Sequence, residues 1–235
     1  MVTDDRRLEI AAGLAAARQR IADAESSAGR EPGAVELVVV TKTHPAEEVG
    51  VLADLGVQHV GENRDQEASA KAEQLVGRDL IWHFIGQLQS NKVRSVVRYA
   101  HVVESVDRPK LVGALSKAVA ARPASRPLRC LVQVCLDEQP GRGGALPREV
   151  ASIADAIADA PGLELGGVMA VAPLGADPDA AFAVLQAVAQ DVAAAHPTAT
   201  TVSAGMSGDL EAAIRHGATQ VRLGSVVLGS RPPFG

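Results

Sequence analysis

Aromatic residues are scarce in this sequence: one Trp, one Tyr and three Phe occur among 235 residues. A core centred on aromatic side chains is therefore excluded, and the interior must be aliphatic. Hydrophobic residues still make up 47% of the chain, which excludes a disordered protein. Lysine is scarce too, because 18 of the 23 basic residues are arginine. The few lysines can be examined one at a time: Lys42, Lys71, Lys92, Lys110 and Lys117.

Only two cysteines are present, Cys130 and Cys135, and both fall in one apolar run that is predicted as a strand. Residues at an odd spacing in a strand point to opposite faces, so these two thiols cannot form a disulfide with each other. No Cys or His spacing typical of a zinc site occurs. We expect a protein of a reducing compartment without a bound metal.

Long apolar runs and an excess of positive charge are also absent. The N-terminus has no apolar signal-peptide core, and no stretch approaches the roughly 18 apolar residues of a membrane span. The net charge of −5 and the pI near 5.7 exclude a non-specific nucleic-acid binder. These absences predict a cytoplasmic protein that binds neither membranes nor nucleic acid.

The sequence does contain a regular alternation of apolar runs and helical segments. A first helix is predicted over residues 4–28, where an apolar stripe runs through Ile10, Leu14, Ala17 and Ile21. The apolar run that follows it is unbroken, as expected for a strand of a parallel sheet that is buried on both faces. Eight strands are predicted, each separated from the next by a helical segment: 37–42, 58–61, 80–85, 101–104, 128–136, 163–171, 200–203 and 220–223.

Such alternation predicts parallel strands joined by right-handed crossovers. Eight strand–helix units favour an α/β protein with one domain over residues 1–235, a (β/α)8 TIM-type barrel with an extra N-terminal helix. The alternative is a doubly wound open sheet. Against it, the first strand is not followed by the GxGxxG loop of dinucleotide-binding sheets.

In such barrels the active site lies at the C-terminal ends of the strands. Two loops at this end are rich in small residues: Gly205-Met206-Ser207-Gly208 follows the seventh strand and Gly224-Ser225 follows the eighth. Small residues let backbone N–H groups approach an anion, so both loops are candidates for binding a phosphate, with Arg222 at the same rim. Ordinary helix caps, which also favour serine, are the alternative interpretation.

Lys42 stands at the C-terminal end of the first strand, after a run of apolar residues. A lysine can reach water from such a position. A desolvated lysine that faces a phosphate site suits Schiff-base chemistry instead, which indicates pyridoxal 5'-phosphate (PLP) or a phosphorylated sugar, as in aldolases. Asn63 follows the second strand, and His83 points away from Trp82 and Phe84, so both are further candidates for this pocket. Either can instead serve the fold, Asn63 as a helix cap and His83 as a hydrogen-bonded core residue.

Taken together, these motifs resemble those of the pyridoxal phosphate homeostasis family (YggS/PROSC). The resemblance extends over residues 5–230, and its most specific parts are the blocks Trp82-His83-Phe84-Ile85-Gly86 and Leu88-Gln89-Ser90-Asn91-Lys92. The other matching blocks occur in the family's order: Val39-Val40-Thr41-Lys42-Thr43, Gly61-Glu62-Asn63, Gly205-Met206-Ser207 and Val221-Arg222-Leu223-Gly224-Ser225.

The resemblance implies a barrel of the alanine-racemase N-terminal type that holds PLP as an internal aldimine and acts in intracellular PLP (vitamin B6) homeostasis and amino/keto-acid balance. It implies Lys42 as the aldimine lysine and Arg222 as the partner of the pyridine nitrogen. An arginine stays charged and keeps that nitrogen unprotonated, which makes the ring a poorer electron sink. The other implied cofactor contacts are Ser207, Gly224 and Ser225 at the phosphate, and Asn63, His83 and Met206 along the pocket wall.

Two positions depart from the family's pattern. Arg64 stands where the family often has Tyr after Gly-Glu-Asn, and Arg142 stands where the loop after the fifth strand often has Lys. Arginine can hold a phosphate but cannot form an imine, so a relay of PLP through residue 142 is not expected. Lys92 matches a family lysine and is the candidate for that role instead.

We expect a monomeric PLP carrier without catalytic turnover, with PLP-dependent apo-enzymes as candidate recipients. The alternative is a PLP-dependent amino-acid racemase of the same fold, which needs a second acid/base on the opposite face of the cofactor. In alanine racemases a further β-domain and a partner subunit supply that group, and no such domain is expected after the eighth strand here. Tyr99, the one tyrosine, is expected away from the C-terminal ends of the strands. A lysine aldolase without PLP is the third hypothesis, and it would be colourless.

Overall fold

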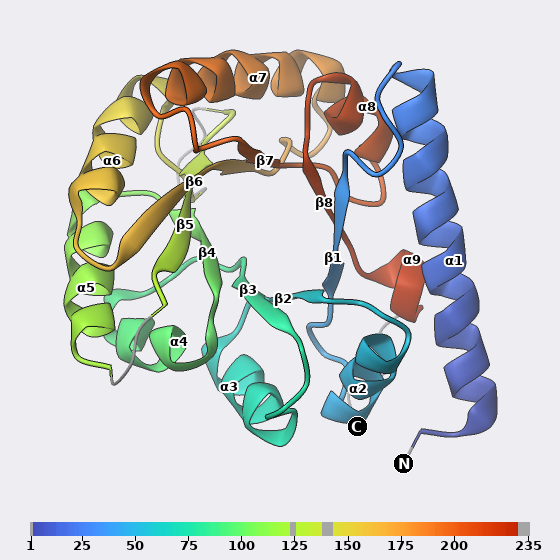
Figure 1. The fold of residues 1–235 in the computed structure, drawn as a ribbon. Helices are drawn as coiled ribbons and strands as arrows, with labels where there is room; N and C mark the ends of the chain where they lie inside the picture. Colours follow the sequence, from blue (N-terminus) through green and yellow to red (C-terminus); the bar gives the residue numbers. More distant parts are fainter. Residues whose placement is uncertain (1, 123–125, 138–142, 230–235) are drawn as a thin grey trace.

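The computed structural model describes residues 2–122, 126–137 and 143–229. Its eight strands pair in parallel and close into a barrel in the order β1 to β8 (Figure 1). The predicted TIM-type barrel is therefore confirmed, and the alternative of an open sheet is wrong. The strands are β1 (Glu36–Val40), β2 (His59–Glu62), β3 (Ile81–Phe84), β4 (Val102–Val106), β5 (Leu128–Val134), β6 (Leu163–Ala170), β7 (Thr201–Ser203) and β8 (Gln220–Leu223).

Helices surround the barrel on the outside, at the places where the sequence predicts them (Figure 1). The predicted short helix after the third strand divides into a 3-10 turn and a regular helix, and one further short helix follows β8. The helical elements are α1 (Asp4–Ser27), α2 (Ala46–Asp54), α3 (Asp65–Gln74), η1 (Ser90–Lys92), α4 (Val93–Tyr99), α5 (Pro109–Ala120), α6 (Pro147–Asp159), α7 (Pro178–Ala195), α8 (Leu210–Arg215) and α9 (Ser225–Leu228).

Local sequence signals account for several helix starts. Helices α5, α6 and α7 each begin with a proline, whose missing N–H would be unpaired in the first turn anyway. Asp177 caps α7 by accepting a hydrogen bond from the backbone N–H of Asp179 at 3.1 Å. Thr3 caps α1 in the same way, through the N–H of Arg6 at 3.3 Å.

The extra helix α1 lies along the outside of the barrel against α8 and α9 (Figure 1). Its predicted apolar stripe is buried, with Ile10 and Ala17 fully covered. Gly13 allows a close approach to α9, because a Cβ at this position would lie 2.4 Å from the backbone oxygen of Val227. The first and last helices of the described chain are thus in direct contact.

The inside of the barrel differs from the aliphatic core between strands and helices. Several of its buried side chains are polar or charged: His83, Glu104, Ser203, Gln220 and Arg222. Cys130 and Cys135 are both buried and unpaired, in agreement with the sequence prediction. No group of side chains suited to hold a metal ion occurs within the described ranges. Over the same ranges, no helix combines the length and the apolar character that crossing a membrane requires.

Candidate functional site

Lys42 lies in the turn directly after β1 and is partly buried. The barrel register places this turn beside the ends of β2 and β8, because Val40 pairs with Gly61 and Val38 pairs with Arg222. Gly224, which follows β8, lies against β1 so closely that a Cβ there would be 3.1 Å from the backbone oxygen of Val40. Closure of the barrel therefore brings the residues after β1, β2 and β8 to one end, as predicted for the site.

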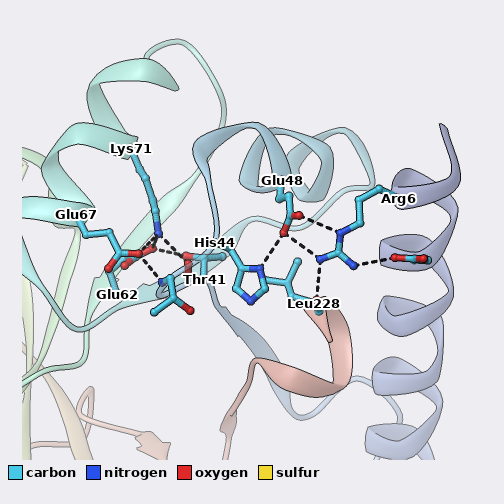
Figure 2. Close-up of polar contacts among 10 residues, drawn as sticks. Arg6, Thr41, His44, Glu48, Glu62, Glu67, Lys71 and Leu228 are labelled. Carbon is cyan, nitrogen blue, oxygen red and sulfur yellow. Dashed lines mark hydrogen bonds and ion pairs between the residues drawn. The ribbon is translucent and has the colours of Figure 1, made fainter. Parts of the chain in front are cut away.

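A buried ammonium holds one side of the Lys42 turn (Figure 2). Lys71, in α3, is only 4% exposed and donates to the backbone oxygen of Thr41 at 2.8 Å. It also contacts one carboxylate oxygen each of Glu62 and Glu67 at 2.7 Å. The backbone N–H of Thr43, a non-glycine residue with a φ of 69°, donates to the same Glu67 oxygen. Lys71 and Glu67 together stabilise a turn conformation that is otherwise unfavourable for threonine.

A second cluster holds the other side of the turn and connects it to α1 and α9 (Figure 2). His44 Nδ1 lies 2.8 Å from Glu48 Oε2, and Arg6 donates to both oxygens of Glu48, at 2.9 and 3.0 Å. The same guanidinium donates to the backbone oxygen of Leu228 at 2.7 Å. Burial opposes ionisation of Glu48, but the hydrogen bonds from Arg6 and His44 lower its pKa overall.

Arg222 extends inside the barrel and is almost fully buried. Its Nη1 donates to Ser203 Oγ at 2.6 Å and lies 3.6 Å from Glu104, and its Nη2 donates to the backbone oxygen of Ala170 at 2.8 Å. Burial lowers the pKa of this guanidinium, and the charge of Glu104 opposes that shift. The chain thus holds one charged arginine in place from β4, β6 and β7.

His83 belongs to the same network, and both of its ring nitrogens have partners. Nδ1 lies 2.6 Å from Glu104 Oε1, and Nε2 lies 2.9 Å from Nδ1 of His59. Although complete burial opposes ionisation of Glu104, the hydrogen bond from His83 lowers the pKa of this carboxyl overall. His83 is therefore the hydrogen-bonded interior histidine of one sequence interpretation, and its contact with a cofactor stays a prediction.

The two loops predicted to bind a phosphate follow β7 and β8. Met206 is exposed and Ser207 partly exposed, and the first of these loops is folded back by a hydrogen bond from the N–H of Met206 to Asp209 Oδ1 at 2.6 Å. Arg20, from α1, donates to the backbone oxygen of Ser207 at 2.9 Å. Ser225 is exposed at the first position of α9. Neither serine is buried.

Asn63 and Lys92 border a cavity of about 410 Å³ between the ends of β2 and β3. Arg64, which departs from the family's pattern, is exposed at the rim of this cavity. The ammonium of Lys92 lies 3.9 Å from Asp65. Arg142, the other departure, lies outside the described residues, so its predicted role stays a prediction.

Tyr99 is the last residue of α4 and packs edge-on against Trp82, with ring centroids 6.5 Å apart. Burial raises the pKa of its hydroxyl. As predicted from the sequence, it does not follow the C-terminal end of a strand.

Sequence reasoning missed several residues of the two networks. The sequence predicts no functional role for Lys71, which falls in a helical segment but has a buried ammonium. The i,i+4 spacing of Glu67 and Lys71, like that of His44 and Glu48, was the available local signal. No local signal connects His59 with His83, because their contact depends on the pairing of β2 with β3.

The donor set at this end of the barrel fits PLP. It offers an amine at Lys42, a buried guanidinium at Arg222 and the hydroxyls of Ser207 and Ser225, which are the kinds of group that an aldehyde, a pyridine nitrogen and a phosphate require. Gly224 has no side chain of its own, and a Cβ there would lie 3.3 Å from the Cβ of Val40.

Comparison with known proteins identifies similar chains over almost the whole length. The family described as alanine racemase, N-terminal domain, matches residues 13–232. The pyridoxal phosphate homeostasis protein of Mycobacterium tuberculosis H37Rv is 44% identical, over 97% of this chain and 95% of that protein. The protein of the same name from Escherichia coli K12 is 35% identical, over 95% and 97%.

Solved structures agree with these similarities. An unknown protein from Bifidobacterium adolescentis superposes with a TM-score of 0.89 at 33% identity and 97% coverage of both chains. PipY of Synechococcus elongatus PCC7942, with PLP bound, superposes with a TM-score of 0.80 at 31% identity, over 94% of this chain and all of that one. Alanine racemase from Corynebacterium glutamicum shares the fold alone, with a TM-score of 0.67 at 15% identity over 60% of its length.

Proposed function

This chain belongs to the pyridoxal phosphate homeostasis protein family, and we propose that it binds PLP and acts in the intracellular homeostasis of this cofactor. The main observation in support of this proposal is that Lys42, Arg222 and two loops of small residues belong to the same end of the closed barrel. PLP-bound PipY, which is similar over most of its length, supports the same conclusion.

We assign the covalent attachment to Lys42. Its Nζ adds to the aldehyde carbon of PLP, a water molecule leaves, and a C=N bond replaces the C=O bond as the Schiff base forms. The Lys71 and Glu48 clusters keep the turn that carries Lys42 in one conformation, which reduces the entropy lost on attachment. Bound PLP supplies an electron sink, and the charge of Arg222 limits that sink by keeping the ring nitrogen unprotonated.

The remaining assignments concern the phosphate and the pocket wall. We place the phosphate at the loops after β7 and β8, where Ser207, Gly224 and Ser225 offer hydroxyls and an open backbone. Asn63, His83 and Met206 form the wall in this proposal. Lys92, at the rim of the neighbouring cavity, is proposed to take part in release of the cofactor.

We propose that PLP is held without steady catalytic turnover. A racemase needs an acid/base on the face opposite the lysine. Tyr99, the one tyrosine of the chain, is buried in α4 against Trp82 and does not offer its hydroxyl there. The arginine partner of the ring nitrogen further restrains carbanion chemistry. Steady turnover of a common amino acid that disappears in Lys42→Ala would contradict this view.

The cellular setting is part of the same proposal. The two buried, unpaired cysteines suit a reducing compartment, so we place the protein in the cytoplasm. We propose a monomer that passes PLP to apo-enzymes. Light scattering of the loaded protein tests its mass, and incubation with a PLP-dependent apo-enzyme tests transfer.

Borohydride reduction tests the attachment site. The purified protein is expected to absorb at the edge of the visible range, and reduction followed by peptide mapping should place the modified residue at position 42. Lys42→Ala should lose the absorption, whereas Lys110→Ala, a change at an exposed lysine of α5, should keep it. A protein that stays colourless after incubation with PLP would refute the proposal, and a modified lysine elsewhere would refute the assignment of Lys42.

A further inference from the structure

A continuous line of polar side chains crosses the inside of the barrel. It begins at the N-terminal mouth with Glu36 and His59, the first residues of β1 and β2, and ends at Arg222 in the C-terminal half. Apart from His83 and Arg222, the residues of this line are not among the cofactor contacts assigned above.

Every link of the line is within hydrogen-bond distance. Glu36 Oε1 lies 2.8 Å from His59 Nε2, and His59 Nδ1 lies 2.9 Å from His83 Nε2. His83 Nδ1 then lies 2.6 Å from Glu104 Oε1. The other oxygen of Glu104 accepts from Ser203 Oγ at 2.6 Å, and that hydroxyl accepts from Arg222 at 2.6 Å.

Solvent reaches this line from the N-terminal mouth. Side-chain exposure falls from 45% at Glu36 to 17% at His59 and 2% at His83, and it is 0% at Glu104. A cavity of about 260 Å³ at the mouth is bordered by Glu36, His59, His83 and Gln220. A proton can therefore enter or leave at His59, while the other end of the line is closed off from water.

Counting protons defines the charge of the two histidines. Each of the three contacts Glu36–His59, His59–His83 and His83–Glu104 needs one proton to be a hydrogen bond. Both carboxyls have lowered pKa values, because the histidine hydrogen bonds outweigh the burial that opposes ionisation, so neither supplies that proton. Two neutral imidazoles carry only two N–H protons. The pair therefore holds one extra proton, and with it one positive charge.

Other charged groups face the pair from the surrounding strands. His101, Arg126 and Arg129 border the same cavity, and Arg222 lies beyond Glu104. His101 Nδ1 accepts a hydrogen bond from the backbone N–H of Trp82 at 3.1 Å, and Arg129 donates to Thr201 Oγ1 at 3.0 Å. The positive charges of Arg126, Arg129 and Arg222 favour release of the extra proton, whereas Glu36 and Glu104 favour its retention.

We propose that His59 and His83 form a proton relay that makes the position of Arg222, and hence the retention of PLP, depend on protonation at the opposite end of the barrel. The statement about PLP rests on the function proposed above. When the extra proton is lost, it passes from His59 Nε2 to a water molecule in the cavity. Nε2 then faces the Glu36 carboxylate with a lone pair, and Glu36 turns toward solvent.

Loss of that charge leaves Arg222 as the cation nearest to Glu104. The guanidinium is then drawn from its present 3.6 Å separation toward the carboxylate, and so away from the ring nitrogen assigned to it. His59 and His83 act through Arg222, so they are positioning residues. PLP is expected to dissociate more readily as the pH rises through the midpoint of the pair, by about tenfold.

Nuclear magnetic resonance of the protein without PLP tests the relay itself. With ring nitrogens labelled by ¹⁵N, His59 and His83 should titrate together with one midpoint, and the Nε–H signal of Arg222 should move with the same midpoint. His59→Asn keeps a donor toward His83 but removes the extra proton. In this variant the titration of His83 and the accompanying shift of the Arg222 signal should both vanish. Glu36→Gln, at a half-exposed position, should shift the midpoint to lower pH. His196→Asn, at a histidine paired with Asp155 outside the barrel, is the matched control.

The outcomes separate the relay from the proposed function. The relay would be refuted, whether or not PLP binds, if His59 and His83 titrate independently of each other. It would also be refuted if the Arg222 signal does not change when they titrate. If the relay titrates as expected, PLP dissociation is measured against pH in the loaded wild type and in His59→Asn. The coupling is supported if PLP dissociation changes at the same midpoint in the wild type but not in His59→Asn. It is refuted if the two proteins show identical dissociation profiles against pH. Failure to bind PLP at all would refute the proposed function and leave the resonance result to decide the relay.

Discussion

Lys71 shows how a single buried charge supports the candidate site. Its ammonium meets Thr41 O, Glu62 and Glu67 at once, and Glu62 is completely buried. Burial raises the pKa of Glu62, and Lys71 opposes that shift. A carboxylate buried without its partner is strongly unfavourable. Substitution of Lys71 is therefore expected to lower the stability of the protein more than substitution of a surface lysine.

Replacing Lys71 is expected to lower stability. Lys71→Met should reduce the free energy of unfolding by about 3 kcal/mol, because Glu62 loses its ion pair. Urea denaturation measures the change, and Lys117→Met, at an exposed lysine of α5, should stay within about 0.5 kcal/mol of the wild type. The double variant with Glu62→Gln should regain part of the loss. Equal stability of Lys71→Met and wild type would show that the ion pair contributes nothing.

Arg222 and Ser207 carry the assignment of the two ends of PLP. Arg222→Gln and Ser207→Ala should each weaken PLP retention, by about tenfold or more for Arg222→Gln, because a charge-assisted contact is lost. Equilibrium dialysis measures retention, and thermal unfolding separates weaker binding from lost fold. Arg215→Gln, at an exposed arginine of α8, is the control and should retain PLP normally. Unchanged retention in both site variants would mean that the ring nitrogen and the phosphate are both misplaced.

At the scale of elements, α1 and α9 matter because they connect the outside of the barrel to the loop after β8. α9 begins at Ser225, next to Gly224. Gly13 presses against the backbone of α9, and Arg6 binds the oxygen of Leu228. A shift of α1 is therefore transmitted to residues that we assign to the phosphate.

A methyl group at this contact tests the connection. Gly13→Ala should cost about 1–3 kcal/mol, because its Cβ would overlap the Val227 backbone, and it should also weaken PLP retention. Gly113→Ala is the matched control, since nothing lies near a Cβ at that position of α5, and it should raise stability by up to about 1 kcal/mol. The two variants should move the urea midpoint in opposite directions. A Gly13→Ala protein as stable as wild type would contradict the close packing.

Elements are also the scale at which the sequence was most informative. Unbroken runs such as Leu37–Val40 and the proline at the start of α7 have local physical causes, so strands and helices were predicted near their observed bounds. Contacts between residues that lie far apart along the chain were not predicted. Ser203 and Glu104 are separated by 99 residues and meet only because the barrel closes. Periodicity indicates which face a side chain takes, but not which side chain of another strand it will contact.

The whole molecule should lose stability in acid. Hydrogen bonds lower the pKa of Glu48, Glu104 and Glu211 below the ordinary value of 4.5, although burial opposes the shift. A carboxyl with a lowered folded-state pKa stabilises the protein above its unfolded value, and this contribution is lost as the pH falls through the folded value. Glu62, with a raised pKa, has the opposite sign.

Urea unfolding at a series of pH values measures this dependence. The free energy of unfolding should fall steadily once the pH drops below about 4.5, because the unfolded chain then binds more protons than the folded one. Glu48→Gln removes one of the responsible carboxyls and should flatten the fall, whereas Glu9→Gln, at a mostly exposed residue of α1, should change it little. Stability that increases on acidification would contradict the assigned directions.

Because the barrel is closed by its first and last strands, the candidate site can form only late in synthesis of the chain. Lys42 and Arg222 stand 180 positions apart, so a ribosome adding about 5–20 residues per second completes one roughly 10–40 s after the other. Until β8 is made, β1 lacks one neighbour, and the guanidinium proposed to face the ring does not exist. On the proposed function, a nascent chain cannot be loaded during synthesis. PLP binding would then report that translation and closure are both complete.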